Sequence, residues 1–184
     1  MVFAPLFNTM PYLTWAKLLN MTRCELEKWR RLARPRAFPY VAVIDVAHSC
    51  NLRCPYCPTG AGRKSGRGRR MIDPLLVTKT LDELDKYLLS AVMYNWGEPL
   101  LHPQLPGIVR IIHERRIFTA ISTNLSISNK EALAELCEAS LDHLTVSLSG
   151  ATQEVYARYH GHGDLALVLE NIRYLASYKK RNRL

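Results

Sequence analysis

Residues 40–57 read Tyr-Val-Ala-Val-Ile-Asp-Val-Ala-His-Ser-Cys-Asn-Leu-Arg-Cys-Pro-Tyr-Cys. The β-branched, apolar run at the start predicts a buried strand over Tyr40–Ala47. The three cysteines that follow, Cys50, Cys54 and Cys57, have the spacing C-x3-C-x2-C. Three thiolates in one tight loop suit three corners of a cubane iron–sulfur cluster, and the fourth iron then keeps an open coordination site. The stretch therefore predicts a strand that leads into an open redox metal site.

Strands and helices alternate through the rest of the chain. Three further strands are predicted, over 91–96, 117–123 and 143–149. Asp73-Pro74 and Asp164 are N-cap signals for two of the helices between and after them. Ser128 and Glu131 have capping-box spacing for a third helix. Such repeats form a parallel sheet with outer helices through right-handed crossovers. The predicted fold class is therefore α/β, with about four strand–helix units in a doubly wound sheet or a partial (β/α) barrel.

Polar residues follow each predicted strand at its carboxyl end. Cys50 comes after the first strand, Glu98 after the second and Asn124 after the third, and Ser147 and Ser149 close the fourth. Both parallel architectures gather their chemistry at this edge of the sheet. We therefore expect these residues to lie around one site.

The chain resembles the radical S-adenosylmethionine (SAM) superfamily from about Tyr40 onward. The matching motifs, in the family's order, are Cys50-Asn-Leu-Arg-Cys54-Pro-Tyr-Cys57, Asn95-Trp-Gly-Glu-Pro99, Ser122-Thr-Asn124 and Val146-Ser-Leu-Ser-Gly150. The stretch Cys-Pro-Tyr-Cys-Pro most resembles the corresponding stretch of family members that carry a SPASM or twitch extension. The family fold is a partial (β/α) barrel with more strand–helix units than the four seen here, so we expect the chain to be a truncated part of a longer enzyme.

The resemblance implies two cofactors and a reaction class. Cys50, Cys54 and Cys57 are expected to hold a [4Fe–4S] cluster whose open iron binds SAM. Reductive cleavage of SAM then gives a 5′-deoxyadenosyl radical that abstracts hydrogen from a substrate. The resemblance leaves open whether this substrate is a peptide, a sugar or another small molecule. The implied electron donor is of the flavodoxin or ferredoxin kind, and the implied chemistry is oxygen-sensitive.

The resemblance also implies the residues that contact SAM. Gly97, Glu98 and Pro99 match the motif that holds its ammonium group. The other expected contacts are Tyr56, Ser122, Asn124, Ser147 and Ser149. Arg53 is a candidate for tuning the cluster, and Arg158 is a weak candidate for the SAM carboxylate.

Several alternatives stay open from the residues alone. The cysteine loop is also compatible with a non-catalytic iron–sulfur or zinc module, in which Cys24, Cys137 or a histidine supplies the fourth ligand. His160 and His162 fit either a metal site or an ordinary loop. The serines and Asn124 fit plain polar caps at strand ends.

Composition limits the partners and the compartment. The 184 residues carry a formal net charge of +9, concentrated in Lys28–Arg36 and Arg63–Arg70. These runs suit solvated surface or anionic partners, and we propose that the second borders an opening for an acidic or phosphorylated substrate. No apolar run is long enough for a transmembrane span, and we expect no nucleic-acid partner. The odd cysteine count and the lack of a secretory signal favour the cytoplasm.

The N-terminal part differs from the repeats. Residues 1–39 are interpreted as a helical extension and residues 40–184 as the partial core domain. A helix is predicted from about Thr14 to Leu32, with Leu18, Met21, Leu26 and Trp29 on its apolar side. This side suits packing on the main domain, or alternatively a membrane surface or partner.

Overall fold

The computed structural model describes residues 6–61 and 70–184. Within these ranges, four parallel strands form one sheet in the order β1-β2-β3-β4. The strands are β1 (Val41–Val43), β2 (Ser90–Val92), β3 (Phe118–Thr123) and β4 (His143–Val146). Their register pairs Val43 with Val92, Val92 with Ala120 and Ala120 with His143. The α/β class and the partial, open parallel sheet are thereby confirmed.

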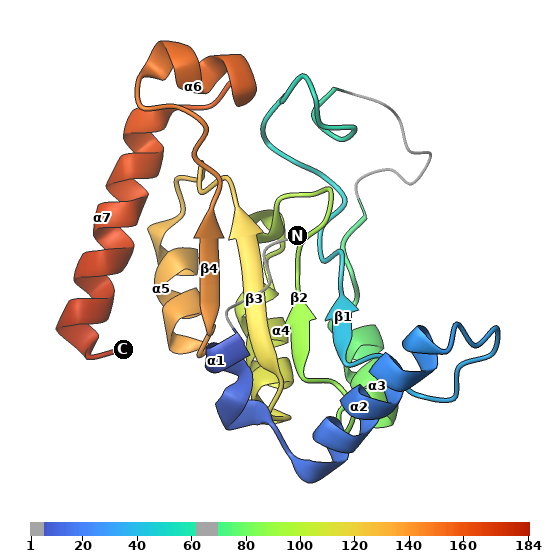
Figure 1. The fold of residues 1–184 in the computed structure, drawn as a ribbon. Helices are drawn as coiled ribbons and strands as arrows, with labels where there is room; N and C mark the ends of the chain where they lie inside the picture. The colour runs from blue at the N-terminus through green and yellow to red at the C-terminus, as the bar shows by residue number, and fades with distance from the viewer. Residues whose placement is uncertain (1–5, 62–69) are drawn as a thin grey trace.

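Helices cover one face of this sheet. In Figure 1, α3 (Pro74–Leu84), α4 (Leu105–Glu114) and α5 (Lys130–Glu138) lie behind the strands. The long helix α7 (Leu165–Asn182) packs on α5, and the short helix α6 (Gln153–Tyr159) contacts α7 above the carboxyl ends of the strands. A 3₁₀ turn, η2 (Pro99–Leu101), follows β2. This is the layer arrangement of strand–helix crossovers.

Two apolar clusters hold the layers together. The larger one joins the sheet to α3, α4 and α5 through fully buried side chains such as Leu81, Ile108, Ile112 and Ile121. The second joins α5, α6 and α7 around Tyr156. Burial of each large apolar side chain contributes about 1.5–3 kcal/mol, so these clusters fix the strands and the loops that extend from them.

The N-terminal elements lie at the opposite end of the sheet from the cysteines. These elements are α1 (Leu6–Thr9), η1 (Met10–Tyr12) and α2 (Trp15–Trp29). The ring of Tyr12 meets the edge of Phe118 at 5.8 Å, and its hydroxyl donates to Asp142. Asp142 also accepts from the amide and hydroxyl of Thr119, both at 2.8 Å. The extension is therefore anchored to the start of β3 and the turn before β4.

Some predicted boundaries differ from the structure. The strands β1, β2 and β4 are shorter than predicted, because their last residues leave the ladder to form the loops at the carboxyl edge. Asp73 and Asp164 cap α3 and α7 as predicted, but Asn129, not Ser128, caps α5. Helix α6 was not predicted. Residues 62–69, which hold most of the basic run Arg63–Arg70, lie outside the described residues.

The four residues predicted on the apolar side of α2 are divided, since Leu18 and Met21 are half-buried. Leu26 and Trp29 are exposed, whereas Lys17 and Asn20 are the buried side chains of this helix. Helical periodicity shows which side of a helix is apolar, but it does not show which side packs on the rest of the domain.

Candidate functional site

The expected site residues gather at the carboxyl edge of the sheet, at the top of Figure 1. The cysteine loop follows β1. It contacts the loop after β2, the residue after β3 and the turn between α6 and α7. The predicted convergence is therefore present for the ends of β1, β2 and β3.

The cysteine loop keeps its three thiols partly buried and unbonded to one another. The five cysteines of the chain all have free thiols. Burial raises the pKa of Cys50 above its usual value, against a hydrogen bond from the amide of Leu52 that lowers it. Burial, and then the neighbouring Cys57, raise the pKa of Cys54. Thiols in such surroundings stay protonated until a metal displaces the proton.

Gly97 sets the approach of the loop after β2 to the cysteine loop. A Cβ atom at this position would lie 1.5 Å from the carbonyl oxygen of Ala47, which no side chain tolerates. The amide of Glu98 donates to the carbonyl of Ser49 at 2.8 Å. A glycine here thus lets the backbone after β2 lie directly against the start of the cysteine loop.

The Glu98 carboxylate is directed into the protein. The residue is 2% exposed, and its Oε1 accepts from the hydroxyl of Thr123 at 2.6 Å and from the amide of Leu100 at 3.0 Å. Its Oε2 accepts from the amide of Asn124 at 2.8 Å. Burial raises the pKa of Glu98, and these three hydrogen bonds act in the opposite direction. Glu98 therefore braces η2 against the end of β3.

Asn124 connects the end of β3 to the cysteine loop. Its amide nitrogen donates to Asn51 Oδ1 at 2.9 Å and lies 3.5 Å from Cys50 Sγ, and Asn51 donates in turn to the carbonyl of Ser126 at 2.6 Å. A side-chain amide that donates to a ligand sulfur can tune the metal group that the sulfur holds.

The remaining predicted residues are less closely engaged. The hydroxyls of Ser122 and Ser147 lie 3.4 Å apart across β3 and the end of β4. Ser149 is exposed in the loop after β4, and Tyr56 is 89% exposed. Arg158 is exposed and forms an ion pair with Glu154 on its own helix.

The turn after α6 is a contact that the sequence did not identify. His160 Nδ1 lies 3.9 Å from Cys54 Sγ, and the imidazole stacks on the ring of Tyr156 at 4.5 Å. The carbonyl of Gly161 accepts from the amide of Arg53 at 2.8 Å, and a Cβ at Gly161 would lie 2.3 Å from the Arg53 carbonyl. The Tyr-His-Gly-His-Gly run was the available signal, because glycines beside histidine permit such a close approach.

The three thiols of the cysteine loop are donors of the kind that iron–sulfur clusters use. Among residues 6–61 and 70–184, no three His, Cys, Asp or Glu side chains gather closely enough to hold one ion. Cys24 on α2 and Cys137 on α5 belong to elements far from the cysteine loop in the fold. Three partly buried thiols on one loop, with polar strand ends beside them, match what a cubane cluster and a polar ligand require.

Curated relatives share this part of the chain. The chain is 28% identical over 136 residues to the PqqA peptide cyclase of Rhodopseudomonas palustris, and the match covers 74% of this chain and 36% of that protein. It is 32% identical over 131 residues to the GTP 3′,8-cyclase of Limosilactobacillus fermentum, which covers 70% of this chain and 39% of the relative. The chain thus spans little more than a third of the length of these relatives.

A solved structure and a family profile also match this chain. The fold is similar to that of Streptococcus suis SuiB bound to the precursor peptide SuiA, with a TM-score of 0.66, 19% identity, and coverage of 86% of this chain and 34% of SuiB. The profile described as the radical SAM superfamily matches residues 44–183, which is most of the chain. The chain therefore belongs to the radical SAM superfamily, whose members bind a [4Fe–4S] cluster and S-adenosylmethionine.

Proposed function

We propose that Cys50, Cys54 and Cys57 hold the [4Fe–4S] cluster of a radical SAM enzyme. The observation that carries the proposal is the bracing of one three-thiol loop by the ends of β2 and β3 and by the turn after α6. Contacts from separate elements fix the backbone of this loop, so less of it has to be ordered when the cluster binds. When bound, the cluster and SAM supply a 5′-deoxyadenosyl radical for hydrogen abstraction.

The chain's own residues would orient and shield these cofactors. Ser122 and Ser147 present hydroxyls at neighbouring strand ends, where a polar ligand finds donors and acceptors. Asn124 presents its amide to the sulfur of Cys50. Gly97, Pro99, Tyr56 and Ser149 are proposed SAM contacts by their place in the family motifs. Three donors already bind the Glu98 carboxylate, so its proposed contribution to the SAM site is to position the loop that carries Gly97.

A peptide is the proposed substrate class. One relative is named for cyclisation of the PqqA peptide, and SuiB is described with its precursor peptide. The further properties that we propose are a SPASM-like affiliation, oxygen sensitivity, a flavodoxin- or ferredoxin-type electron donor and a cytoplasmic location.

Anaerobic reconstitution with iron and sulfide tests the cluster assignment. The wild-type chain should bind about four irons and show the electron paramagnetic resonance signal of a reduced [4Fe–4S] cluster. SAM should change that signal, because it binds the open iron. Cys54→Ala should fail to assemble the cluster, whereas the matched variant Cys24→Ala, whose thiol lies on α2, should retain it.

Two results would count against the proposal. Full iron content in Cys54→Ala would remove that thiol from the ligand set. A wild-type signal that SAM leaves unchanged would favour the alternative function, a metal-binding module without SAM chemistry. Circular dichroism of each variant separates loss of ligand from loss of fold.

A further inference from the structure

Helix α2 carries four large apolar side chains on the side that points away from the domain. Its buried side chains are the polar residues Lys17 and Asn20. The apolar residues Trp15, Leu19, Leu26 and Trp29 are 80%, 67%, 49% and 77% exposed. An amphipathic helix of a globular domain normally has the reverse arrangement.

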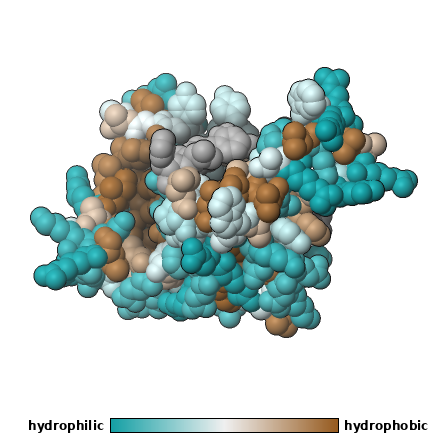
Figure 2. All heavy atoms as spheres, turned by 60° about the horizontal axis from the view of Figure 1, so that its bottom comes forward, coloured by the Kyte–Doolittle hydropathy of each residue, from teal (hydrophilic) through white to brown (hydrophobic). Residues whose placement is uncertain are grey.

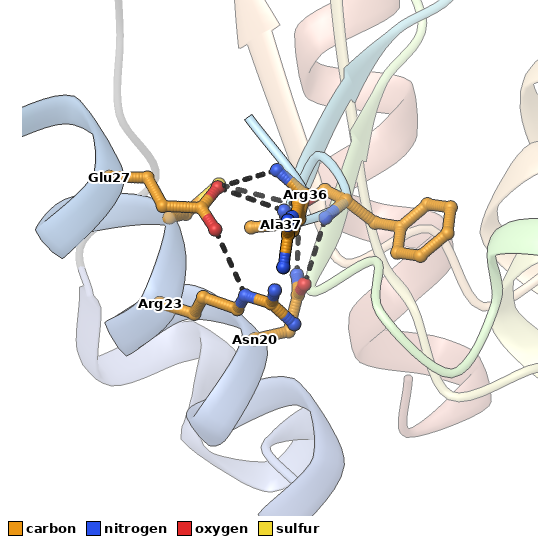
Figure 3. Close-up of polar contacts among 7 residues, drawn as sticks. Asn20, Arg23, Glu27, Arg36 and Ala37 are labelled. Atoms are coloured by element: carbon orange, nitrogen blue, oxygen red, sulfur yellow. Dashed lines mark hydrogen bonds and ion pairs between the residues drawn. The ribbon is translucent and has the colours of Figure 1, made fainter. Parts of the chain in front are cut away.

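Specific polar contacts hold this orientation. Asn20 donates to the carbonyl of Phe38 at 2.8 Å and accepts from its amide at 3.0 Å. Glu27 accepts from the amides of Arg36 and Ala37 at 2.8 and 2.9 Å, as Figure 3 shows. A rotation of α2 that buried its tryptophans would break these hydrogen bonds. The outward direction of the apolar side is therefore built into the fold.

The four exposed apolar residues form one stripe. Their spacings of 4, 7 and 3 residues place them on the same side of a helix with 3.6 residues per turn. Trp15 is the first residue of α2 and Trp29 the last, so the stripe runs the length of the helix. Figure 2 views the underside of the molecule and shows apolar side chains exposed there among hydrophilic ones. Large apolar side chains exposed along one side of a helix favour an interaction surface there.

The charge beside the stripe indicates the partner. Lys28, Arg30, Arg31, Arg34 and Arg36 lie at and just beyond the end of α2. Arg30, Arg31 and Arg34 form no ion pair with an acidic residue in the described part of the chain. A second copy would bring a like-charged cluster against this one, which disfavours self-association. An anionic bilayer satisfies both features, since it takes tryptophan and leucine into its interface and attracts arginine.

We propose that α2 attaches the protein to anionic membrane surfaces, with the stripe of Trp15, Leu19, Leu26 and Trp29 in the headgroup region. The helix would lie in the plane of the interface and would not cross it. No described helix is long and apolar enough to span a bilayer. This attachment is independent of the proposed radical chemistry, because the stripe is at the opposite end of the sheet from the cysteines.

Vesicle cosedimentation with the full chain tests the proposal. Phosphatidylcholine vesicles with and without phosphatidylglycerol are compared at low and high salt. We expect binding to the anionic vesicles, a blue shift of tryptophan emission on binding, and release as salt screens the arginines. Leu19→Ser/Leu26→Ser should weaken binding about tenfold or more, because it removes half of the apolar stripe. The matched control Leu75→Ser/Leu76→Ser changes two leucines on α3 that are 57% and 56% exposed, and it should bind like the wild type.

Three outcomes would overturn the proposal. The first is no sedimentation of the wild type with anionic vesicles, and the second is equal binding by the stripe variant and the control. The third is a dimer, detected by light scattering, that the stripe variant abolishes, since this would assign the stripe to a second copy. Thermal melts of all variants establish that the exposed substitutions leave the fold intact.

Discussion

Glu98 is expected to stabilise the fold as well as the cofactor site, and Glu98→Gln tests this in the cofactor-free chain. The wild-type carboxylate receives hydrogen bonds from Thr123, Leu100 and Asn124 at a position that is 2% exposed. The glutamine oxygen can replace Oε1 and keep two of these donors. Its amide group then faces the amide of Asn124, so that two donors meet where a donor met an acceptor.

The magnitude follows from two opposing effects. Loss of a hydrogen bond to a charged group costs about 1.5–3 kcal/mol, and a buried donor left without an acceptor costs about 1–3 kcal/mol. Burial raises the pKa of Glu98, which means that the neutral amide recovers part of the desolvation cost of the carboxylate. We therefore expect a net loss of about 2 kcal/mol in the free energy of unfolding, or about 4–8 °C in Tm for a domain of this size.

Urea and thermal denaturation of the apo chain, followed by circular dichroism, measure this loss. The control is Glu83→Gln on the exposed side of α3, which should change stability by less than about 0.5 kcal/mol. The urea m-value should be the same in both variants, because the native state stays equally compact. If Glu98→Gln is as stable as the control, the carboxylate does not brace η2 and β3, and its assignment returns to direct contact with SAM.

Three further predictions follow from other contacts. His160→Phe keeps an aromatic ring on Tyr156 but removes the nitrogen near Cys54. The midpoint potential of the reconstituted cluster, measured by redox titration, should then fall. An unchanged potential would contradict a hydrogen bond from His160 to the Cys54 sulfur. Burial lowers the pKa of Lys17 from 10.5 to about 8, so between pH 8 and 10.5 the folded chain has released a proton that the unfolded chain keeps. The unfolding free energy of the wild type, relative to that of Lys17→Met, should therefore rise with pH across this window. A difference that does not change with pH would refute the lowered pKa of Lys17. Tyr12→Phe removes the hydroxyl that donates to Asp142 and should lower stability by about 1 kcal/mol in urea denaturation, whereas no change would show that the extension is held by apolar packing alone.

Local signals in the sequence predicted the elements whose causes are local. Asp73 and Asp164 were recognisable caps because the amides that they bind lie two or three residues along the chain. The order of strands and helices was predictable for the same reason, since apolar spacing is a property of each segment. Even α6 had such a signal, because Thr152 accepts from the amide of Val155.

Long-range contacts decide what the motifs do, and these were not predictable. The Gly-Glu-Pro motif located Glu98, but the donors to its buried carboxylate include Thr123 at the end of the next strand and Asn124 directly after it. The contact between His160 and Cys54 joins residues that are 106 positions apart. The outward apolar side of α2 likewise depends on backbone groups of residues 36–38, which no helical wheel includes.

The structure also explains why the cysteine loop can be short and still hold three donors in place. Its start lies against Gly97, its Asn51 is bonded to Asn124, and its Arg53 is bonded to Gly161. Each of these partners follows a different strand or helix of the domain, so the packing of the whole sheet fixes the loop, and the loop needs little structure of its own. Because two of the three contacts depend on backbone atoms beside a glycine, the loop is sensitive to the glycines as well as to the cysteines. The motifs that follow the cysteines in the chain therefore support the cysteine loop structurally, whatever further contacts they make with the proposed cofactors.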